Sequence, residues 1–188
     1  MSSREPSKYI IALIGVVGSG KTHIAKILSK RLGAARITTD EIRVGLRKRR
    51  RSYNQAPKIT ARRAERFLRN GQSVILDFDA INPARRRELR WRAREFEARL
   101  YFLEVRTPQR TILARLRKKR YTSGDLFKDA DEATRVYFVR KKFREKFRHK
   151  RFTPRLRQGF GGQASFTVDN SRSLEPQIEK IVRAIKGL

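Results

Sequence analysis

The sequence contains no cysteine and only two histidines, His23 and His149. Disulfide bonds and thiolate zinc sites are therefore excluded, and a metal cage built from histidines is not expected. No apolar run approaches the ~20 residues that a membrane-spanning helix requires, and no signal peptide is visible. We therefore expect a soluble, cytoplasmic protein with no membrane partner, whose residues 1–7 form a frayed polar tail.

Acidic residues are also scarce in this chain. Its 188 residues include 18 Asp and Glu against 48 Lys and Arg, which gives a formal net charge of +30 at pH 7. Such a charge attracts polyanions, so we expect non-specific polyanion binding, with nucleic acid as the first candidate. Because the basic residues are spread along the whole chain, a general compositional bias is the alternative. Few aromatic residues stand among them, so a stacking platform for single strands is not evident.

A glycine-rich stretch at residues 15–22, with the sequence GVVGSGKT, fits the phosphate-binding loop pattern G-x-x-x-x-G-K-[ST]. An apolar run of strand length precedes it at 8–14, and apolar residues at helical spacing follow it at 23–32. Strand, loop and helix therefore stand in the order that the motif requires. The alternative is a glycine-rich turn that merely opens a helix. The stretch predicts a nucleotide-binding site.

The residue types of this loop suit the binding of phosphate. Glycine lets the backbone adopt torsions closed to other residues, so that successive N–H groups approach a phosphate at a helix N-terminus. Lys21 is expected to reach the β- and γ-phosphates of ATP, and Thr22 to place its hydroxyl on Mg²⁺. The nucleotide-binding residues predicted from the motif are Gly15, Gly18, Ser19, Gly20, Lys21 and Thr22.

A second informative stretch, ITTDEIR at 37–43, ends a short strand and begins a helix that Thr39 can cap. Asp40 and Arg43 are three residues apart and therefore share one face of that helix. A carboxylate there could accept the proton of an attacking hydroxyl, and an arginine one turn later could hold an anionic substrate. A helix cap with an exposed ion pair accounts equally well for the same spacing. We expect the helix to end near Gly45 in a basic, exposed segment.

Apolar strands and amphipathic helices alternate along the rest of the chain. Further strands are expected at 34–38, 73–78, 100–105 and 166–168, and helices at 57–70, 83–98, 108–119, 129–149 and 174–185. This order predicts one three-layer α/β domain over residues 8–188, with a mostly parallel five-stranded sheet and helices on both faces. We expect a lid and basic helical segment over about 115–151, and a flexible glycine-rich loop over about 154–164.

The helix at 129–149 is strongly basic, and its expected apolar face consists of Val136, Val139, Phe143 and Phe147. The glycine loop that follows it faintly resembles the signature of transporter ATPases, but a flexible loop is the better interpretation. The Asn-Lys-x-Asp motif with which GTPases bind guanine is absent from the sequence. A GTPase is therefore not indicated.

Taken together, these motifs resemble those of the small P-loop kinases, a group that includes the polynucleotide 5′-kinases, the zeta toxins and many predicted kinases. The stretches that carry the resemblance are Gly15–Thr22, Thr39–Arg43, Gly71–Asp77, Asn82–Arg86, the arginines Arg115 and Arg120, and Val168–Asp169. The resemblance implies a P-loop NTPase fold, the use of ATP and Mg²⁺, and transfer of a γ-phosphoryl group to an acceptor hydroxyl.

The resemblance also implies roles for single residues. The aspartate matching Asp40 is the general base of the group, and the arginine matching Arg43 binds the acceptor's phosphate in polynucleotide kinases. One arginine before the lid, which we align with Arg115, packs on adenine, and another, aligned with Arg120, contacts the transferring phosphate. We expect Lys21, Asp40, Arg43 and Arg120 to act in catalysis.

A carboxylate at the end of the third strand is expected near the Mg²⁺ ion in this group. Asp77 and Asp79 are both candidates, because alternate residues of an extended chain point to the same side. We prefer Asp77 as the metal-binding residue, together with Thr22. A strand-end cap is the alternative explanation for Asp77.

The sequence leaves three functions open. The first is a kinase that acts on the 5′-hydroxyl of DNA or RNA. The second is a zeta-toxin-like kinase for a small molecule such as a sugar, a nucleoside or a nucleotide-sugar. The third is a basic ATPase that binds nucleic acid and phosphorylates no acceptor.

Overall fold

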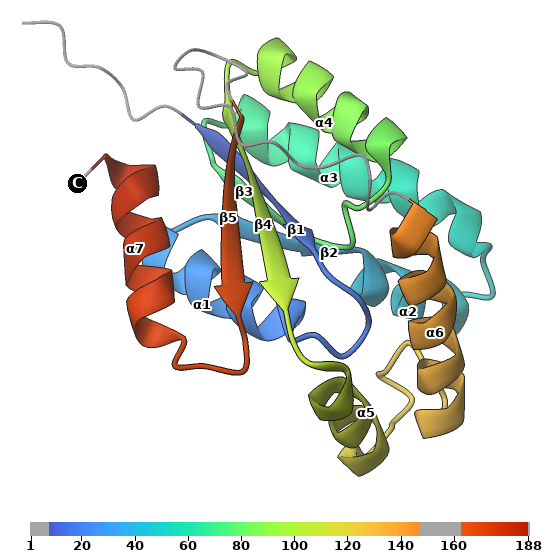
Figure 1. Ribbon diagram of the computed structural model, residues 1–188. Coiled ribbons are helices and arrows are strands. Elements are labelled where there is room, and N and C mark those ends of the chain that lie inside the picture. The colour runs from blue at the N-terminus through green and yellow to red at the C-terminus, as the bar shows by residue number, and fades with distance from the viewer. Residues whose placement is uncertain (1–7, 147–162, 188) are drawn as a thin grey trace, which may run out of the picture.

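The computed structural model describes residues 8–146 and 163–187 of the chain. Its centre is a five-stranded sheet with the strand order β2-β3-β1-β4-β5, in which every neighbouring pair is parallel (Figure 1). The strands are β1 (Tyr9–Ile14), β2 (Ala35–Thr38), β3 (Val74–Asp77), β4 (Arg99–Arg106) and β5 (Gln163–Asp169). The predicted fold class is confirmed, and the sheet is parallel throughout.

Helices cover both faces of the sheet, and a further pair lies beyond its carboxyl edge (Figure 1). The helices α1 and α7 lie on one face, and α2, α3 and α4 on the other. Their bounds are α1 (Lys21–Leu32), α2 (Thr39–Lys48), α3 (Ala56–Arg69), α4 (Pro83–Glu95), α5 (Gln109–Lys118), α6 (Ala130–Lys146) and α7 (Glu175–Lys186), with a short 3-10 turn at Tyr53–Gln55.

The alternation of side chains along β1 divides the core between the two helical layers. Ile10 and Ala12 pack toward α3 and α4, whereas Ile11 and Leu13 pack toward α1 and α7. Because both faces are buried, the strand reads as a continuous apolar run. A third, smaller cluster of apolar residues joins α5 and α6 to the phosphate loop: Val16, Ile112, Leu116, Ala133 and Tyr137.

Two local expectations were wrong. The residue that caps α2 is Thr38, not Thr39, and neither side chain caps the helix, because Thr38 Oγ1 hydrogen-bonds Asp77 and Thr39 Oγ1 pairs with Thr60. The helix also continues past Gly45 to Lys48; its basic end is exposed at 48–51 as expected, whereas Arg47 donates hydrogen bonds to three carbonyl oxygens of the segment between α5 and α6.

The apolar face expected on α6 differs from the buried one. Tyr137 is buried against α5, whereas Val139 is 67% exposed. The reason is that α6 contacts α5 through only a narrow stripe of side chains, whereas a neighbouring stripe of side chains lines a cleft. Phe147 and most of the expected glycine loop (154–162) lie outside the described residues, and β5 begins at Gln163. Among the helices that the structure describes, none is long and apolar enough to span a bilayer.

Candidate active site

The predicted phosphate-binding loop connects β1 to α1 at the carboxyl edge of the sheet, where open α/β sheets bind their ligands. Gly20 precedes α1 with φ of 91°, and Gly18 has φ of 76°, both in the region that favours glycine. A Cβ atom on Gly18 would also lie 2.9 Å from Ile112 Cγ2. The two glycines therefore let α5 approach the loop while the first turn of α1 stays open to a ligand.

Two residues that the sequence analysis did not single out fasten this loop. Thr107 Oγ1, just after β4, and Asn170 Nδ2, just after β5, each donate a hydrogen bond of 2.8 Å to the carbonyl oxygen of Ser19. Arg115 Nη2 reaches the carbonyl oxygen of Asn170 at 3.4 Å. The predicted adenine-side arginine therefore stands beside the phosphate loop, on the α5 side.

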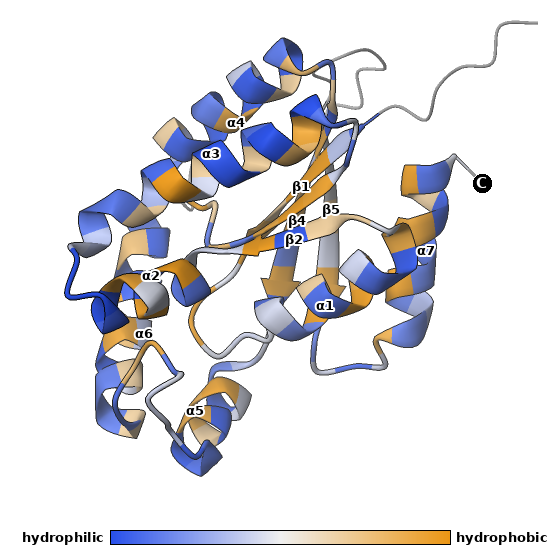
Figure 2. Ribbon diagram, turned by 180° about the vertical axis from the view of Figure 1, so that it is seen from behind, coloured by the Kyte–Doolittle hydropathy of each residue, from blue (hydrophilic) through white to orange (hydrophobic). Residues whose placement is uncertain are grey.

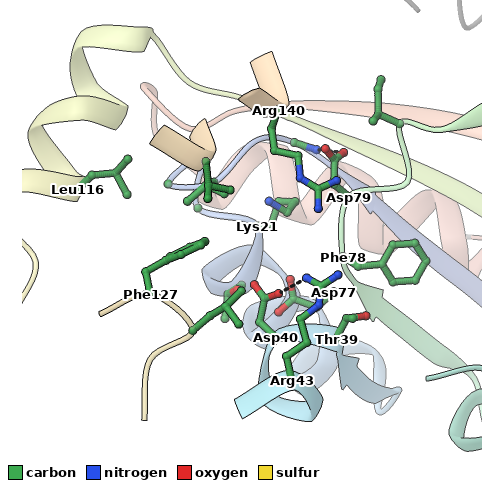
Figure 3. A pocket seen from close by; sticks show the side chains of 18 of the residues that line it. Lys21, Thr39, Asp40, Arg43, Asp77, Phe78, Asp79, Leu116, Phe127 and Arg140 are labelled. Carbon is green, nitrogen blue, oxygen red and sulfur yellow. Dashed lines mark hydrogen bonds and ion pairs between the residues drawn. The ribbon is translucent and has the colours of Figure 1, made fainter. Parts of the chain in front are cut away.

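Lys21 lies at the floor of the site, where its Nζ donates a 2.9 Å hydrogen bond to the carbonyl oxygen of Val16. Burial lowers the pKa of the Lys21 ammonium below its ordinary value, and the charges of Asp79, Asp77 and Asp40 oppose that shift. Three carboxylates from two neighbouring strand ends thus surround one ammonium (Figure 3). Charged groups gathered around a buried ammonium in a cleft are typical of functional sites.

Asp79, the second candidate for the metal-binding carboxylate, contacts the phosphate loop directly. Its Oδ1 accepts a 3.1 Å hydrogen bond from the backbone N–H of Gly15. Its Oδ2, like Ser19 Oγ, is buried without a hydrogen-bond partner in the described part of the chain. A buried carboxylate oxygen without a partner is costly, and a cation or its bound water would satisfy it. The residues present therefore fit a Mg²⁺ ion at this place.

Asp77, the preferred metal-binding residue, lies in the same cleft but is held by other residues. Its Oδ2 accepts hydrogen bonds of 2.9 Å from both Thr38 Oγ1 and Arg36 Nη1, and its side chain is only 3% exposed. Arg36 also pairs with Glu41 on α2. These contacts bind the ends of β2 and β3 together and fix the direction of Asp77.

No cluster of three or more potential metal-ligating side chains is present among the described residues. A Mg²⁺ ion would therefore take most of its ligands from water, phosphate and the Thr22 hydroxyl, as is usual for this ion in nucleotide sites. Thr22 is exposed in the first turn of α1 and lines the cleft.

On α2, Asp40 and Arg43 share one face, as their spacing predicted. Arg43 Nη1 donates a 3.1 Å hydrogen bond to Asp40 Oδ1, and both side chains point into the cleft opposite Lys21 (Figure 3). One turn later, Arg47 fastens the segment between α5 and α6 through the carbonyl oxygens of Leu126, Ser123 and Asp125. The helix thus lines the cleft and holds part of its cover.

The cleft has a volume of about 1520 Å³ and runs from the phosphate loop to α2, α3 and the start of α4. Four aromatic side chains line the cleft, namely Tyr53, Phe78, Phe127 and Phe143, and Phe127 packs against the apolar cluster that contains Val16 of the loop. Arg85 lies over the Phe78 ring at 5.7 Å from its centroid and pairs with Glu88 at 3.0 Å. This end of the cleft is therefore both cationic and aromatic.

The helix α6 supplies an arginine that the sequence analysis did not identify. Val136, Arg140 and Phe143 line the cleft, and Arg140 points toward Lys21 and Asp79 (Figure 3). These three residues are four and three positions apart, so they lie on one face of the helix. The sequence did not distinguish Arg140 from the many other basic residues of this helix. Arg120, which was expected to contact the transferring phosphate, follows α5 in an exposed position and does not line the cleft.

Comparison with known proteins identifies the family. The model of the AAA domain family AAA_33 matches residues 10–147, which include the phosphate loop, α2, Asp77, Asp79 and all of α6. The chain belongs to this family. No curated protein matches the sequence of this AAA_33 chain at a significant level.

The AAA_33 chain has the fold of small kinases of known structure. A putative kinase from Chloroflexus aurantiacus j-10-fl is 17% identical, with a TM-score of 0.60 over 97% of this chain and 96% of that chain. A sugar kinase from Janibacter sp. HTCC2649 is 17% identical, with a TM-score of 0.56 over 94% and 93%. A gluconokinase from Sinorhizobium meliloti 1021 is 15% identical, with a TM-score of 0.56 over 96% and 91%.

Proposed function

We propose that this protein is an ATP- and Mg²⁺-dependent kinase that transfers the γ-phosphoryl group of ATP to an acceptor hydroxyl in the cytoplasm. The observation that supports it most directly is the position of Asp40, which faces Lys21 of the phosphate loop across one cleft. A nucleotide-binding loop with a carboxylate opposite it provides a donor site and a general base in a single cavity.

On the donor side, the backbone N–H groups of residues 15–22 would bind the phosphates, and Lys21 would reach the β- and γ-phosphates. Thr22 and Asp79 would hold Mg²⁺ and its water, with Asp77 fixed beside them by Arg36. The ion, when bound, would offset the charge of the triphosphate. Arg115 would lie on the nucleotide side of the loop.

On the acceptor side, Asp40 would take the proton of the acceptor hydroxyl as its oxygen bonds to the γ-phosphorus and ADP leaves. Arg43 holds the Asp40 carboxylate in place through their 3.1 Å contact, and would hold an anionic acceptor. Arg140 points at the space between the two sites and is better placed than Arg120 to stabilise charge on the transferring phosphoryl group.

The first acceptor that we propose is the 5′-hydroxyl end of DNA or RNA. Its support is the combination of Arg43 and Arg85 with the Phe78 ring in the cleft, which suits a phosphate group next to a planar base. The net charge of +30 would assist the encounter with such an acceptor.

The second candidate is a small-molecule kinase, as expected for a zeta-toxin-like protein. Its support is that the segment held by Arg47, together with α6, covers the cleft, whose volume suits ATP and one compact acceptor. Two of the structural neighbours are described as a sugar kinase and a gluconokinase. A nucleic-acid-binding ATPase without an acceptor would leave the ion pair of Asp40 and Arg43 without a chemical role.

The test is phosphoryl transfer from γ-labelled ATP in the presence of Mg²⁺. Separate reactions contain a 5′-hydroxyl DNA, a 5′-hydroxyl RNA, and a pool of sugars, nucleosides and nucleotide-sugars. The variant Asp40→Asn should lower transfer at least ~100-fold while ATP binding is kept, because only the proton acceptor is lost. The control is Glu41→Gln, the neighbouring carboxylate of α2, which pairs with Arg36.

The label identifies the acceptor. Label on an oligonucleotide supports the first acceptor, and label only in the pool replaces it with the second. The kinase proposal fails if no acceptor is labelled while ATP is bound and hydrolysed, or if Asp40→Asn and Glu41→Gln transfer equally well.

A further inference from the structure

The two helices α3 and α4 lie side by side on one face of the sheet (Figures 1 and 2). Together they contain eleven Lys and Arg residues and three glutamates. Figure 2 shows hydrophilic residues along the outer sides of both helices. Their inner sides pack on the core through Ala64, Leu68 and Leu89, among others. The basic residues are therefore concentrated on a continuous outer surface.

Helical spacing orders these charges into two stripes. On α3, Lys58, Arg62, Arg66 and Arg69 are all exposed and follow one another at four, four and three residues. On α4, Arg87, Trp91 and Arg94 are exposed at spacings of four and three. Residues at these spacings lie on one face of a helix. We call these seven residues the α3–α4 basic face.

Two of the three glutamates of these helices form ion pairs, but most cations of the α3–α4 basic face have no acidic partner among the described residues. Glu65 of α3 pairs with Arg92 of α4, and Glu88 pairs with Arg92 and Arg85. None of the ion pairs in the described part of the chain involves the face residues Lys58, Arg62, Arg66, Arg69, Arg87 or Arg94. The remaining glutamate of the two helices, Glu95, lies at the end of α4.

Like charges also repel one another along α4. Burial lowers the pKa of Arg90, and the charge of Arg94 lowers it further. Burial and the charge of Arg90 also lower the pKa of Arg86, although the charge of Asp79 opposes that shift. Repulsion of this kind costs stability in the isolated protein, and a bound polyanion would relieve it.

The position of Trp91 within this face indicates the kind of polyanion. Trp91 is 60% exposed, which is uncommon for tryptophan. The Arg92 guanidinium lies 6.0 Å from the centroid of its ring. An exposed indole between Arg87 and Arg94 offers a stacking surface to an unpaired base, with cations on both sides for the adjoining phosphates.

The face also leads to the cleft. Pro57 and Thr60 near the start of α3, and Asn82 and Arg85 at the start of α4, line the cleft, and both helices run away from it. A helix of the length of α3 spans about 21 Å at 1.5 Å per residue. That length corresponds to roughly six phosphates if the strand is stacked as in a duplex, at 3.4 Å per nucleotide.

We propose that the α3–α4 basic face binds the backbone of single-stranded nucleic acid and that Trp91 stacks on one of its bases. This binding requires neither ATP nor phosphoryl transfer, so it stands or fails independently of the proposed kinase activity. Single-stranded RNA and DNA share the chemistry that the face would recognise, and the experiment compares them.

The probe is Trp91 itself, because it is the only tryptophan of the chain. The full-length protein, without nucleotide, is titrated with single-stranded RNA and DNA 20-mers, a duplex 20-mer, and vesicles that contain phosphatidylserine. We expect tryptophan quenching by the single strands, with weaker quenching by the duplex. A blue-shifted emission with vesicles and no quenching by oligonucleotides would overturn the proposal in favour of a lipid surface.

Charge variants locate the binding surface. The triple variant R62Q/R66Q/R94Q should weaken binding about tenfold or more, measured by anisotropy of a labelled strand. It should also reduce the slope of log K against log salt by about 2, because each phosphate contact contributes about 0.7 for single strands. The matched control, K26Q/K30Q/K180Q, removes three exposed cations from α1 and α7 on the opposite face of the sheet.

Equal losses in the two triple variants would overturn the proposal, because they would attribute binding to net charge alone. Thermal melting of both variants tests that they are folded. The conservative variant R62K/R66K/R94K should restore most of the salt slope, since the charges are kept. If the lysine variant binds as weakly as the glutamine variant, the phosphate contacts that we propose are wrong.

Discussion

At the residue scale, the feature on which the site depends is the ammonium of Lys21. It is held at the floor of the cleft by the carbonyl oxygen of Val16, and its pKa is lowered by burial although three carboxylates oppose the shift. The triphosphate of ATP carries more negative charge than a carboxylate, and on the phosphate loop it would bind Lys21 directly. Nucleotide binding should therefore return the pKa of Lys21 toward, or above, its ordinary value.

This linkage predicts a proton uptake. Because the lowered pKa belongs to the nucleotide-free protein, ATP affinity should decline as the pH rises through that pKa. Between that pKa and the higher pKa of the ATP complex, calorimetry in two buffers of different ionisation enthalpy should detect the uptake of up to one proton per ATP.

The control for this prediction is Lys21→Met, which should bind ATP weakly and without the pH-dependent uptake. Uptake of the same size in the variant would assign the proton to another group. Proton release in the wild type would contradict the sign of the argument.

Single residues also show what the sequence could predict. The phosphate loop, Asp40 and Arg43 were found because their signals are local, at spacings within one loop or one helical turn. Asn170 and Arg140 reach the site from segments far along the chain, and no local spacing reveals such a contact. Asp79 was considered second to Asp77, since sequence alone does not show which carboxylate is held by Arg36.

At the element scale, α2 carries the predicted base at its start and holds the segment between α5 and α6 at its end. Arg47 accomplishes this through hydrogen bonds of 2.7–3.1 Å to the carbonyl oxygens of Leu126, Ser123 and Asp125. An ion pair between Lys119 and Asp125 closes the same segment on itself. The Arg47 guanidinium therefore connects α2 with the segment between α5 and α6 that covers the cleft.

Replacing Arg47 by alanine should release this segment. We expect protease cleavage between residues 119 and 128 to become several-fold faster, and the KM for the acceptor to rise with less change in the KM for ATP. Global stability should fall by only about 1–2 kcal/mol, because the lost bonds lie at the surface.

Lys48→Ala is the matched control, since Lys48 is the exposed neighbour in the same helix. If Arg47→Ala leaves both cleavage and the acceptor KM unchanged, the segment is held by other contacts.

Most helices and strands could be predicted from the spacing of apolar residues and from the residue types at the ends of the elements. Gly33 ends α1 in the left-handed conformation, and the Asn82 side chain accepts a hydrogen bond from the Ala84 N–H at the start of α4, as their residue types indicated. The expectations failed where long-range contacts compete with local ones. The hydroxyl of Thr38 bonds Asp77 across the sheet instead of capping α2, and the buried stripe of α6 is set by α5.

At the scale of the whole molecule, the net charge of +30 acts on every part of the surface. Self-repulsion of this size favours expanded states, and salt screens it over distances of about 10 Å at 0.1 M. The melting temperature should therefore rise by several degrees between 20 and 300 mM sodium chloride.

The variant K26Q/K30Q/K180Q should show a smaller rise in melting temperature, because it carries less charge. Measurement by circular dichroism at fixed pH is sufficient. A melting temperature that falls with salt would mean that the ion pairs of the surface outweigh its repulsion.

The position of β1 at the middle of the sheet has a consequence for synthesis on the ribosome. Ile10 pairs with Val74 on one side and with Leu100 on the other, so the earliest strand waits for partners made much later. At roughly 5–20 residues per second, the wait for the second partner lasts about 5–20 s. During that time the nascent chain presents an apolar strand with two open edges, which makes it a natural client for chaperones that bind emerging polypeptides.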